Sequence, residues 1–170
     1  MKPQDILFIL KLVSLGEKQW VFNKLAVDLG MSASEVHAAS KRALNARLVV
    51  KLTDSIRPNQ RNVKEFLWHG IQYVFVPEKS GVVRGMPTAH AAEPLVSLFA
   101  SSDDLPPVWP DPEGSMRGES FSPLYPSVPR AAKNDRKLYQ LLALVDALRG
   151  GRARERELAK GLMSNMLSQS

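Results

Sequence analysis

The chain has 170 residues, 44% of them hydrophobic and 24% charged, which is typical of a globular protein and excludes a fibrous or largely disordered one. It contains no cysteine, which excludes disulfides, cysteine-ligated zinc and thiol nucleophiles, and its three histidines are too far apart in sequence to favour a metal centre. The 23 Lys and Arg against 17 Asp and Glu give a net charge of +6, which permits a polyanionic partner without proving one. No apolar run approaches the roughly 18 residues of a membrane span, and the first residues do not resemble a signal peptide, so we expect a cytoplasmic protein.

Charges and prolines divide the chain into three segments. Residues 1–76 hold eleven Lys or Arg and six Asp or Glu, a net charge of +5. Residues 77–129 hold three and seven, a net of −4, and residues 130–170 hold nine and four, a net of +5. Ten of the twelve prolines lie in the middle segment, and proline fixes φ and cannot donate to a β-ladder. We expect a basic N-terminal domain, an acidic, irregular Pro-rich connector that wraps along the other segments, and a basic C-terminal helical hairpin.

The N-terminal segment begins with a pattern of three short helices. Apolar side chains recur at three- and four-residue steps over residues 3–15 and again over residues 20–29. Gly30 marks the end of the second helix, since glycine adopts the left-handed conformation without a Cβ penalty. The third helix is predicted to begin after Ser32 and to run to about Arg47.

The stretch from Leu25 to Val36 resembles the winged helix-turn-helix regulators of the MarR type, and the resemblance covers about residues 6–52. Ala26 is small where the second and third helices cross, Gly30 stands in the turn four residues later, and Val36 packs the third helix onto the second. Ser32 and Glu35 have the spacing of a capping box, which supports the start of the third helix.

The resemblance implies that the third helix is a recognition helix whose outward side chains meet base edges in the major groove of DNA. With Val36, Ala39 and Ala43 facing inward, the candidate DNA-binding residues of this helix and its cap are Ser32, Ser34, His37, Ala38, Lys41, Arg42 and Asn45. Lys41 and Arg42 could contact phosphate or guanine, and Ser34 and His37 could read base edges. The alternative is a solvated helix face, or a helix-turn-helix that binds protein.

The sequence departs from the family after the third helix. Residues 48–52 predict a strand of the kind that leads into a wing, but a basic polar loop over residues 55–62 follows in place of a clear hairpin. We then expect a helix near residues 63–71 and a short strand over residues 73–76. The wing is therefore predicted to be short, or to be replaced by a fourth helix. Arg57 and Arg61 are candidate phosphate contacts in this region.

Two helices are predicted in the C-terminal segment, over residues 135–149 and about 152–167, separated by Gly150 and Gly151. In winged-helix regulators such terminal helices commonly form the dimer interface, and the resemblance implies that role here. Three arginines stand near the start of the last helix, where their charges oppose the helix dipole: Arg152, Arg154 and Arg156. They either bind an acidic protein surface or DNA phosphate, or form a solvated helix face.

No catalytic pattern stands out. We find no nucleophile elbow, phosphate loop, dinucleotide fingerprint or metal-binding motif, so we predict no enzyme activity, no cofactor and no metal. The cluster from Arg84 to His90 is explained by turn chemistry, and the alternative is a small-ligand pocket that also contains Arg117.

The sequence therefore predicts a mainly α protein with a small β component: a winged-helix-like domain over residues 1–76, an irregular connector over 77–129 and a helical hairpin over 130–170. The expected function is sequence-specific binding of double-stranded DNA as a homodimeric transcriptional regulator, most of the affinity coming from phosphate contacts. The alternative is an antitoxin or operon autorepressor whose residues 77–170 bind a partner protein, a toxin in that case. A ligand-responsive sensor is a third hypothesis.

Overall fold

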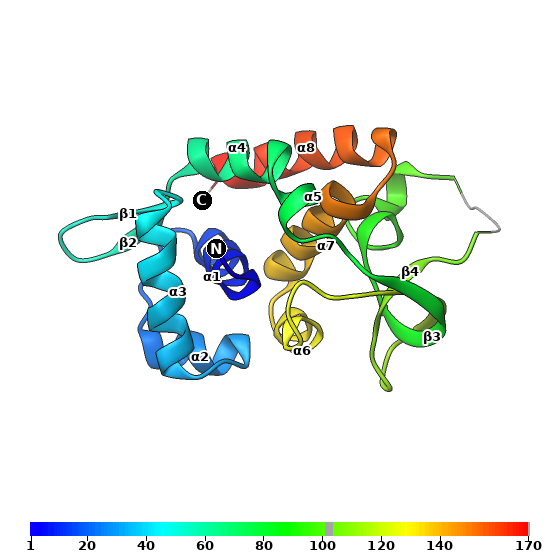
Figure 1. The fold of residues 1–170 in the computed structure, drawn as a ribbon, viewed down its shortest axis with the longest axis horizontal. Helices are drawn as coiled ribbons and strands as arrows, with labels where there is room; N and C mark the ends of the chain where they lie inside the picture. Colours follow the sequence, from blue (N-terminus) through cyan, green and yellow to red (C-terminus); the bar gives the residue numbers. More distant parts are fainter. Residues whose placement is uncertain (101–103, 170) are drawn as a thin grey trace.

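The computed structural model describes residues 1–100 and 104–169 and is mainly α-helical with a small β component (Figure 1). The helices are α1 (Pro3–Leu15), α2 (Phe22–Leu29), α3 (Ala33–Asn45), α4 (Gln60–His69), α5 (Ile71–Val74), α6 (Val128–Lys133), α7 (Arg136–Gly150) and α8 (Ala153–Ser168), with short 3-10 turns η1 (Ala89–Ala91) and η2 (Val96–Leu98). The strands are β1 (Val49–Lys51), β2 (Ile56–Pro58), β3 (Lys79–Pro87), β4 (Pro107–Pro110) and β5 (Met116–Phe121). The predicted fold class is confirmed at this level.

Helix α7 lies at the centre of the molecule, and all but its first turn and its last residue is enclosed by other elements. It packs against α1, α5, α6, α8 and η1, and its residues 141–149 are all buried. One hydrophobic core extends from Ile6 in α1 to Leu167 in α8. The three segments distinguished by charge therefore share a single core.

The three N-terminal helices form as the sequence predicts. The turn after α2 contains Gly30 in the left-handed conformation, with φ of 62° and ψ of 37°. The side chain of Ser32 accepts a hydrogen bond from the Glu35 amide at 3.2 Å, and the Glu35 carboxylate accepts one from the Ser32 amide at 2.8 Å. The capping box is thus complete, and α2 and α3 pack against each other through small and apolar residues of their inner faces.

A short hairpin follows α3, where the sequence predicted only one strand and a loop. Strands β1 and β2 are antiparallel, with Val49 opposite Pro58 and Lys51 opposite Ile56. Part of the predicted polar loop is therefore a strand, because four residues, 52–55, suffice to reverse the chain. The strand predicted over residues 73–76 is wrong: those residues end the one-turn helix α5 and continue as a loop.

The acidic Pro-rich segment is not the irregular connector that we predicted. Strand β3 pairs with both β4 and β5 in antiparallel fashion, and β4 pairs with β5 in parallel, so the three strands close into a small barrel. Strand prolines stand at or near strand ends, where a missing N–H donor does least harm. Gly118 allows the strands to approach closely, because a Cβ there would overlap the Pro106 carbonyl oxygen.

A buried polar network joins this barrel to α7. The carboxylate of Asp146 accepts hydrogen bonds from Thr88 Oγ1 at 2.6 Å, Trp109 Nε1 at 2.6 Å and Arg149 Nε at 2.8 Å. The Arg149 guanidinium also donates to the carbonyls of Phe75 and Ser122. Burial raises the pKa of the Asp146 carboxyl and is the largest influence on it. The hydrogen-bond donors and the Arg149 charge act in the opposite direction but do not cancel this effect.

The predicted C-terminal helical hairpin is present as α7 and α8. Asp135 caps α7 by accepting the Leu138 amide at 2.9 Å, and α8 buries one row of side chains against the core: Ala159, Met163 and Leu167. Since residues 141–149 of α7 are buried, the exposed surface of this hairpin consists mainly of the outer face of α8 and the first turn of α7.

Candidate nucleic-acid interface

Helix α3 presents one polar stripe to solvent. Ser34, His37, Lys41 and Asn45 recur at steps of three and four residues and are all exposed, whereas Val36, Ala39 and Ala43 on the opposite face are fully buried. Lys41 and Asn45 make no side-chain hydrogen bond or ion pair with any residue that the structure describes. A lysine ammonium and an asparagine amide left open in this way can bind phosphate and a base edge, respectively.

The start of α3 is held in place from two sides. Ser32, a predicted DNA contact, is engaged in the cap, where its hydroxyl also donates to Glu35 Oε2 at 2.8 Å. Tyr125, which comes from the segment before α6, donates to the other Glu35 oxygen at 2.9 Å. Hydrogen bonds from the Ser32 amide and hydroxyl, and from Tyr125, lower the pKa of Glu35. Glu35 is therefore a structural anion that fixes the N-terminus of α3.

The predicted outward orientation of Arg42 is wrong. Its guanidinium points at α1, where Nε lies 3.0 Å from both carboxylate oxygens of Asp5 and Nη2 lies 2.6 Å from Oδ1. The Asp5 side chain is fully buried, and hydrogen bonding to it raises the pKa of Arg42. Arg42 therefore ties α3 to α1, because a buried carboxylate needs a charged partner.

Two other predicted DNA contacts, His37 and Ala38, are partly engaged within the chain. The His37 ring stacks on Phe22 of α2, with ring centroids 3.9 Å apart and an interplanar angle of 20°. His37 nevertheless remains exposed. Ala38 is half-buried and offers only a methyl group.

The two arginines predicted near the wing occupy different environments. Arg57 in β2 is half-buried and donates to the carbonyls of Gly16 and Glu17, just beyond the end of α1, where a cation is favoured by the helix dipole. It thus anchors the hairpin. Arg61 is exposed on the first turn of α4 and has no side-chain partner among the described residues.

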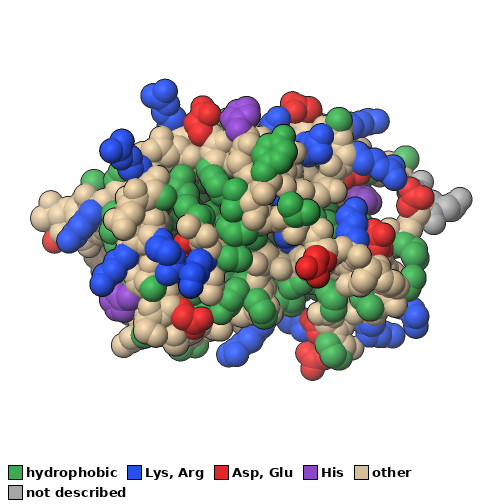
Figure 2. Space-filling view, viewed as in Figure 1, with side chains coloured by type: hydrophobic (Ala, Val, Ile, Leu, Met, Phe, Trp, Pro, Cys, Tyr) green, Lys and Arg blue, Asp and Glu red, His purple; other side chains and the backbone are tan. Residues whose placement is uncertain are grey.

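Sequence reasoning missed several exposed cations around α3. Lys51 lies in the hairpin, Arg47 follows α3 with a positive φ of 58°, and Lys18 and Lys24 lie in the loop before α2 and in α2 itself. Figure 2 shows several Lys and Arg side chains at the end of the molecule that carries α3 and the hairpin, and others toward the opposite end. The hairpin brings Lys51 to this end, and its pairing was not apparent in the sequence.

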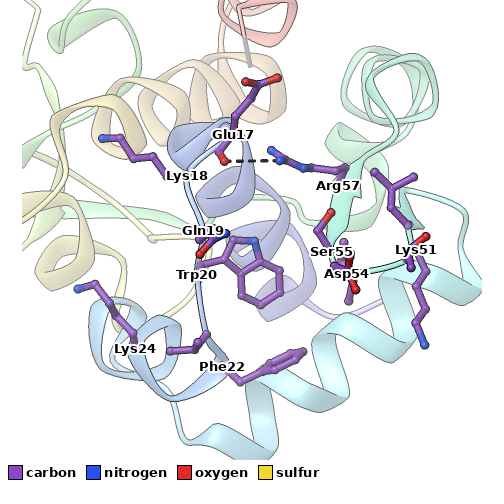
Figure 3. A pocket seen from close by; sticks show the side chains of 14 residues that line it. Glu17, Lys18, Gln19, Trp20, Phe22, Lys24, Lys51, Asp54, Ser55 and Arg57 are labelled. Carbon is purple, nitrogen blue, oxygen red and sulfur yellow. Dashed lines mark hydrogen bonds between the residues drawn. The ribbon is translucent and has the colours of Figure 1, made fainter.

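A pocket of about 690 Å³ opens beside this surface, between the hairpin and the segment from Glu17 to Lys24 (Figure 3). Trp20 and Phe22 form its aromatic wall, with ring centroids 5.2 Å apart. Figure 3 shows Lys18 and Lys24 on one side of Trp20 and Lys51 on the other.

The alternative pocket containing Arg84, His90 and Arg117 does not form. Arg84 and Arg117 are exposed and opposite each other on β3 and β5, whereas His90 lines a separate cavity near Glu155, whose carboxylate lies 3.5 Å from His90 Nδ1. Within residues 1–100 and 104–169, no group of three or more metal-ligating side chains is placed to hold an ion.

The sequence left open the role of three arginines at the start of α8, and each of them has a neighbour within the chain: Arg152, Arg154 and Arg156. Arg152 lies 3.8 Å from Asp104, Arg154 lies 5.9 Å from the centre of the Phe99 ring, and Arg156 donates to the Gly151 carbonyl at 2.9 Å. Arg152 and Arg154 nevertheless remain exposed, so Arg156 is the one of the three whose contact, to the main chain, indicates a structural role.

Comparison with known proteins gives no match for this chain, whether with protein-family models, curated proteins or solved structures. Among the helices that the structure describes, none is long and apolar enough to cross a membrane.

Proposed function

We propose that this protein is a sequence-specific transcriptional regulator that inserts α3 into the major groove of double-stranded DNA. The observation that carries the proposal is the exposed stripe of Ser34, His37, Lys41 and Asn45, displayed on a helix whose opposite face is fixed in the core. A helix presented in this way can enter a major groove, which is wide enough to admit it. The resemblance of residues 25–36 to MarR-type regulators supports the same reading.

The charges around α3 favour a polyanionic partner. Lys41 on α3, Arg47 after it and Lys51 in the hairpin are exposed and lie in consecutive elements. In this proposal the β1–β2 hairpin acts as a short wing, and Lys51, rather than Arg57, tracks the backbone. Phosphate contacts of this kind supply most non-specific affinity and make it dependent on salt.

The direct test is binding of the full chain to a labelled duplex from upstream of its own gene, compared with random duplex over a range of salt concentrations. Selective binding that weakens steeply with salt is expected, because each phosphate contact releases a counterion. Absence of binding, or equal binding to both duplexes, would contradict the proposal.

Two substitutions separate base reading from phosphate contact. Lys41→Ala should weaken binding to both duplexes and lower the slope of log affinity against log salt by about 1. If the Asn45 amide reads a base, Asn45→Ala should reduce the difference in binding free energy between the specific and the random duplex by about 1–3 kcal/mol. The matched control is Arg117→Ala, which removes an exposed cation from β5, in the barrel far from α3. Equal losses in all three variants would indicate a general charge effect instead of a defined interface.

A homodimer is part of the proposal, since two α3 helices would then read half-sites about one helical turn apart. The outer face of α8 is the largest exposed surface of the C-terminal hairpin, because residues 141–149 of α7 are buried. Light scattering of the full chain, free and with a palindromic duplex, tests this directly. A monomer in both states would contradict it.

A second candidate function is that of an autorepressor whose later segments bind a protein partner. Exposed apolar side chains in η2 and just before β4 favour it: Val96 at 42%, Leu98 at 45% and Leu105 at 51% exposure. Co-expression with the product of the neighbouring gene, followed by affinity purification, would test the idea. The double substitution Leu98→Ser and Leu105→Ser should release such a partner and leave DNA binding intact.

A further inference from the structure

The pocket between the β1–β2 hairpin and residues 17–24 has the chemistry of a ligand site. We propose that it binds a small molecule in which a planar aromatic group carries an anionic substituent, with the size of a mononucleotide. The claim of binding is independent of DNA recognition, whereas its regulatory consequence rests on the function proposed above.

The aromatic end of the ligand would lie against Trp20. The Trp20 ring is half-buried, and it makes edge-to-face contacts with Phe8 and with Phe22, at centroid distances of 6.1 and 5.2 Å. Its indole N–H makes no hydrogen bond within the described part of the chain. An immobilised indole with an open face and a free donor suits a flat aromatic group that also offers a hydrogen-bond acceptor.

The anionic end of the ligand would meet the lysines of the rim. Lys18, Lys24 and Lys51 all line the pocket, and Lys18 and Lys51 have no side-chain hydrogen bond or ion pair with any described residue. Lys24 is 70% exposed and lies 3.5 Å from Asp28, a loose pair that a stronger anion can displace. Arg57, by contrast, is committed to main-chain carbonyls, and two carboxylates, those of Glu17 and Asp54, line the pocket beside the three lysines.

The volume of the pocket indicates the size of the occupant. Small-molecule sites commonly enclose about 300–1,000 Å³, and about 690 Å³ exceeds what a single small ring needs. A nucleotide and a larger aromatic carboxylate share the required chemistry, so the probes below distinguish these two sources.

Occupancy of the pocket would reach α3 through one aromatic contact. Phe22 forms part of the pocket wall and stacks on His37, with 3.9 Å between ring centroids. His37 belongs to the exposed stripe of α3. The hairpin forms the opposite wall through residues 51–57, so a ligand touches both parts of the proposed DNA-binding surface. Binding there would change the affinity for DNA.

The test is calorimetric titration of the full chain with AMP and with 2-naphthoate, alongside adenosine and ribose 5-phosphate, which lack the anion and the aromatic group respectively. We expect AMP, 2-naphthoate or both to bind more tightly than about 1 mM, and the two partial probes to bind at least tenfold more weakly. Binding of AMP alone identifies a nucleotide site, and binding of 2-naphthoate alone identifies an aromatic carboxylate site. Failure of both complete probes overturns the proposal.

Variants locate the site. Lys18→Ala combined with Lys51→Ala, and separately Trp20→Leu, should each lower the affinity for the bound probe at least tenfold, whereas the surface control Arg117→Ala should change it less than twofold. Circular dichroism checks the fold of Trp20→Leu. If that variant unfolds, the double variant Lys18→Ala with Lys51→Ala tests the location of the site alone. If the double lysine variant binds the probe as tightly as the unaltered chain, the ligand binds elsewhere and the proposal is overturned.

DNA binding measured with and without the probe separates the two proposals. Ligand binding without any DNA binding would refute the regulator and leave the pocket standing. DNA binding without any ligand binding would refute the pocket alone. A ligand that binds at the pocket and leaves DNA affinity unchanged would overturn its regulatory role.

Discussion

Replacing Arg42 with alanine should destabilise the protein and leave the side chains of the proposed DNA-binding surface in place, which is the opposite of what the helix pattern alone suggests. The substitution removes three donor contacts to the carboxylate of Asp5, at 3.0, 3.0 and 2.6 Å, and leaves only the Lys2 amide at 2.7 Å. Asp5 has no exposed side-chain surface, so its charge would be buried without a cationic partner.

The magnitude follows from the burial of the two partners. Breaking a buried ion pair costs about 3–5 kcal/mol, and we expect about 3 kcal/mol because the Arg42 side chain is 30% exposed and the Lys2 amide remains. For a chain of this size, that loss lowers Tm by about 6–12 °C. Urea unfolding followed by circular dichroism measures the free energy of unfolding directly.

Two further variants test the reasoning. Lys41→Ala, one position earlier and exposed, should change the free energy of unfolding by less than about 0.5 kcal/mol. Asp5→Asn combined with Arg42→Ala should be more stable than Arg42→Ala alone, because no buried charge is left. If Arg42→Ala unfolds like the unaltered protein and yet loses DNA binding, Arg42 contacts DNA and our reading of α3 is wrong.

Three other perturbations have defined outcomes. Gly118→Ala should cost about 1–3 kcal/mol in urea unfolding, because its Cβ would overlap the Pro106 carbonyl, which is main chain and cannot rotate away. Asp146→Asn should cost about 3–5 kcal/mol in the same assay, because it leaves the buried Arg149 guanidinium without its anion, and an unchanged stability would show that the pair is dispensable. Burial opposes ionisation of Asp135, yet its hydrogen bonds and its lysine partner lower its pKa below the ordinary 3.8, so its contribution to stability is present above about pH 4 and is lost as pH falls further. Thermal unfolding at a series of pH values should therefore show a shallower loss of Tm at acid pH for Asp135→Asn than for the unaltered chain.

The parts of the fold that the sequence predicted are those encoded by neighbouring residues. The helix-turn-helix depends on Gly30 in the turn and on Ser32 with Glu35 at the cap, and all three signals lie within six residues. The two C-terminal helices were found for the same reason, since an apolar stripe and the break at Gly150 are local. Such signals need no knowledge of the rest of the chain.

The barrel was missed because its pairing is not local. Strands β3 and β5 pair although about thirty residues separate them in sequence, and neither strand carries a sequence signal that indicates its partner. The prolines misled the prediction as well, because Pro87, Pro107 and Pro110 stand at strand ends. Proline density alone therefore does not distinguish an irregular segment from short strands that end at proline.

The candidate site was predicted in part for a related reason. A helical repeat places Lys41 and Asn45 clearly outside, but Arg42 lies at the boundary between the exposed stripe and the inner face. Its orientation was decided by Asp5, 37 residues away in sequence and buried on α1. Lys51 was missed as a site residue because its position depends on the pairing of β1 with β2.

The proposed DNA-binding surface is held by residues from the whole chain, which bears on how such a surface could be regulated. Tyr125 bonds Glu35 at the start of α3, Ser127 donates to the Leu29 carbonyl at the end of α2, and Lys11 of α1 pairs with Asp135 at the cap of α7. The other faces of α1 are buried against α7 and the rest of the core. Residues 1–76 taken alone would expose that apolar surface and lose these polar anchors. A partner that pulled on the segment before α6 would consequently act on α2 and α3, because Tyr125 and Ser127 of that segment donate to Glu35 and to the Leu29 carbonyl.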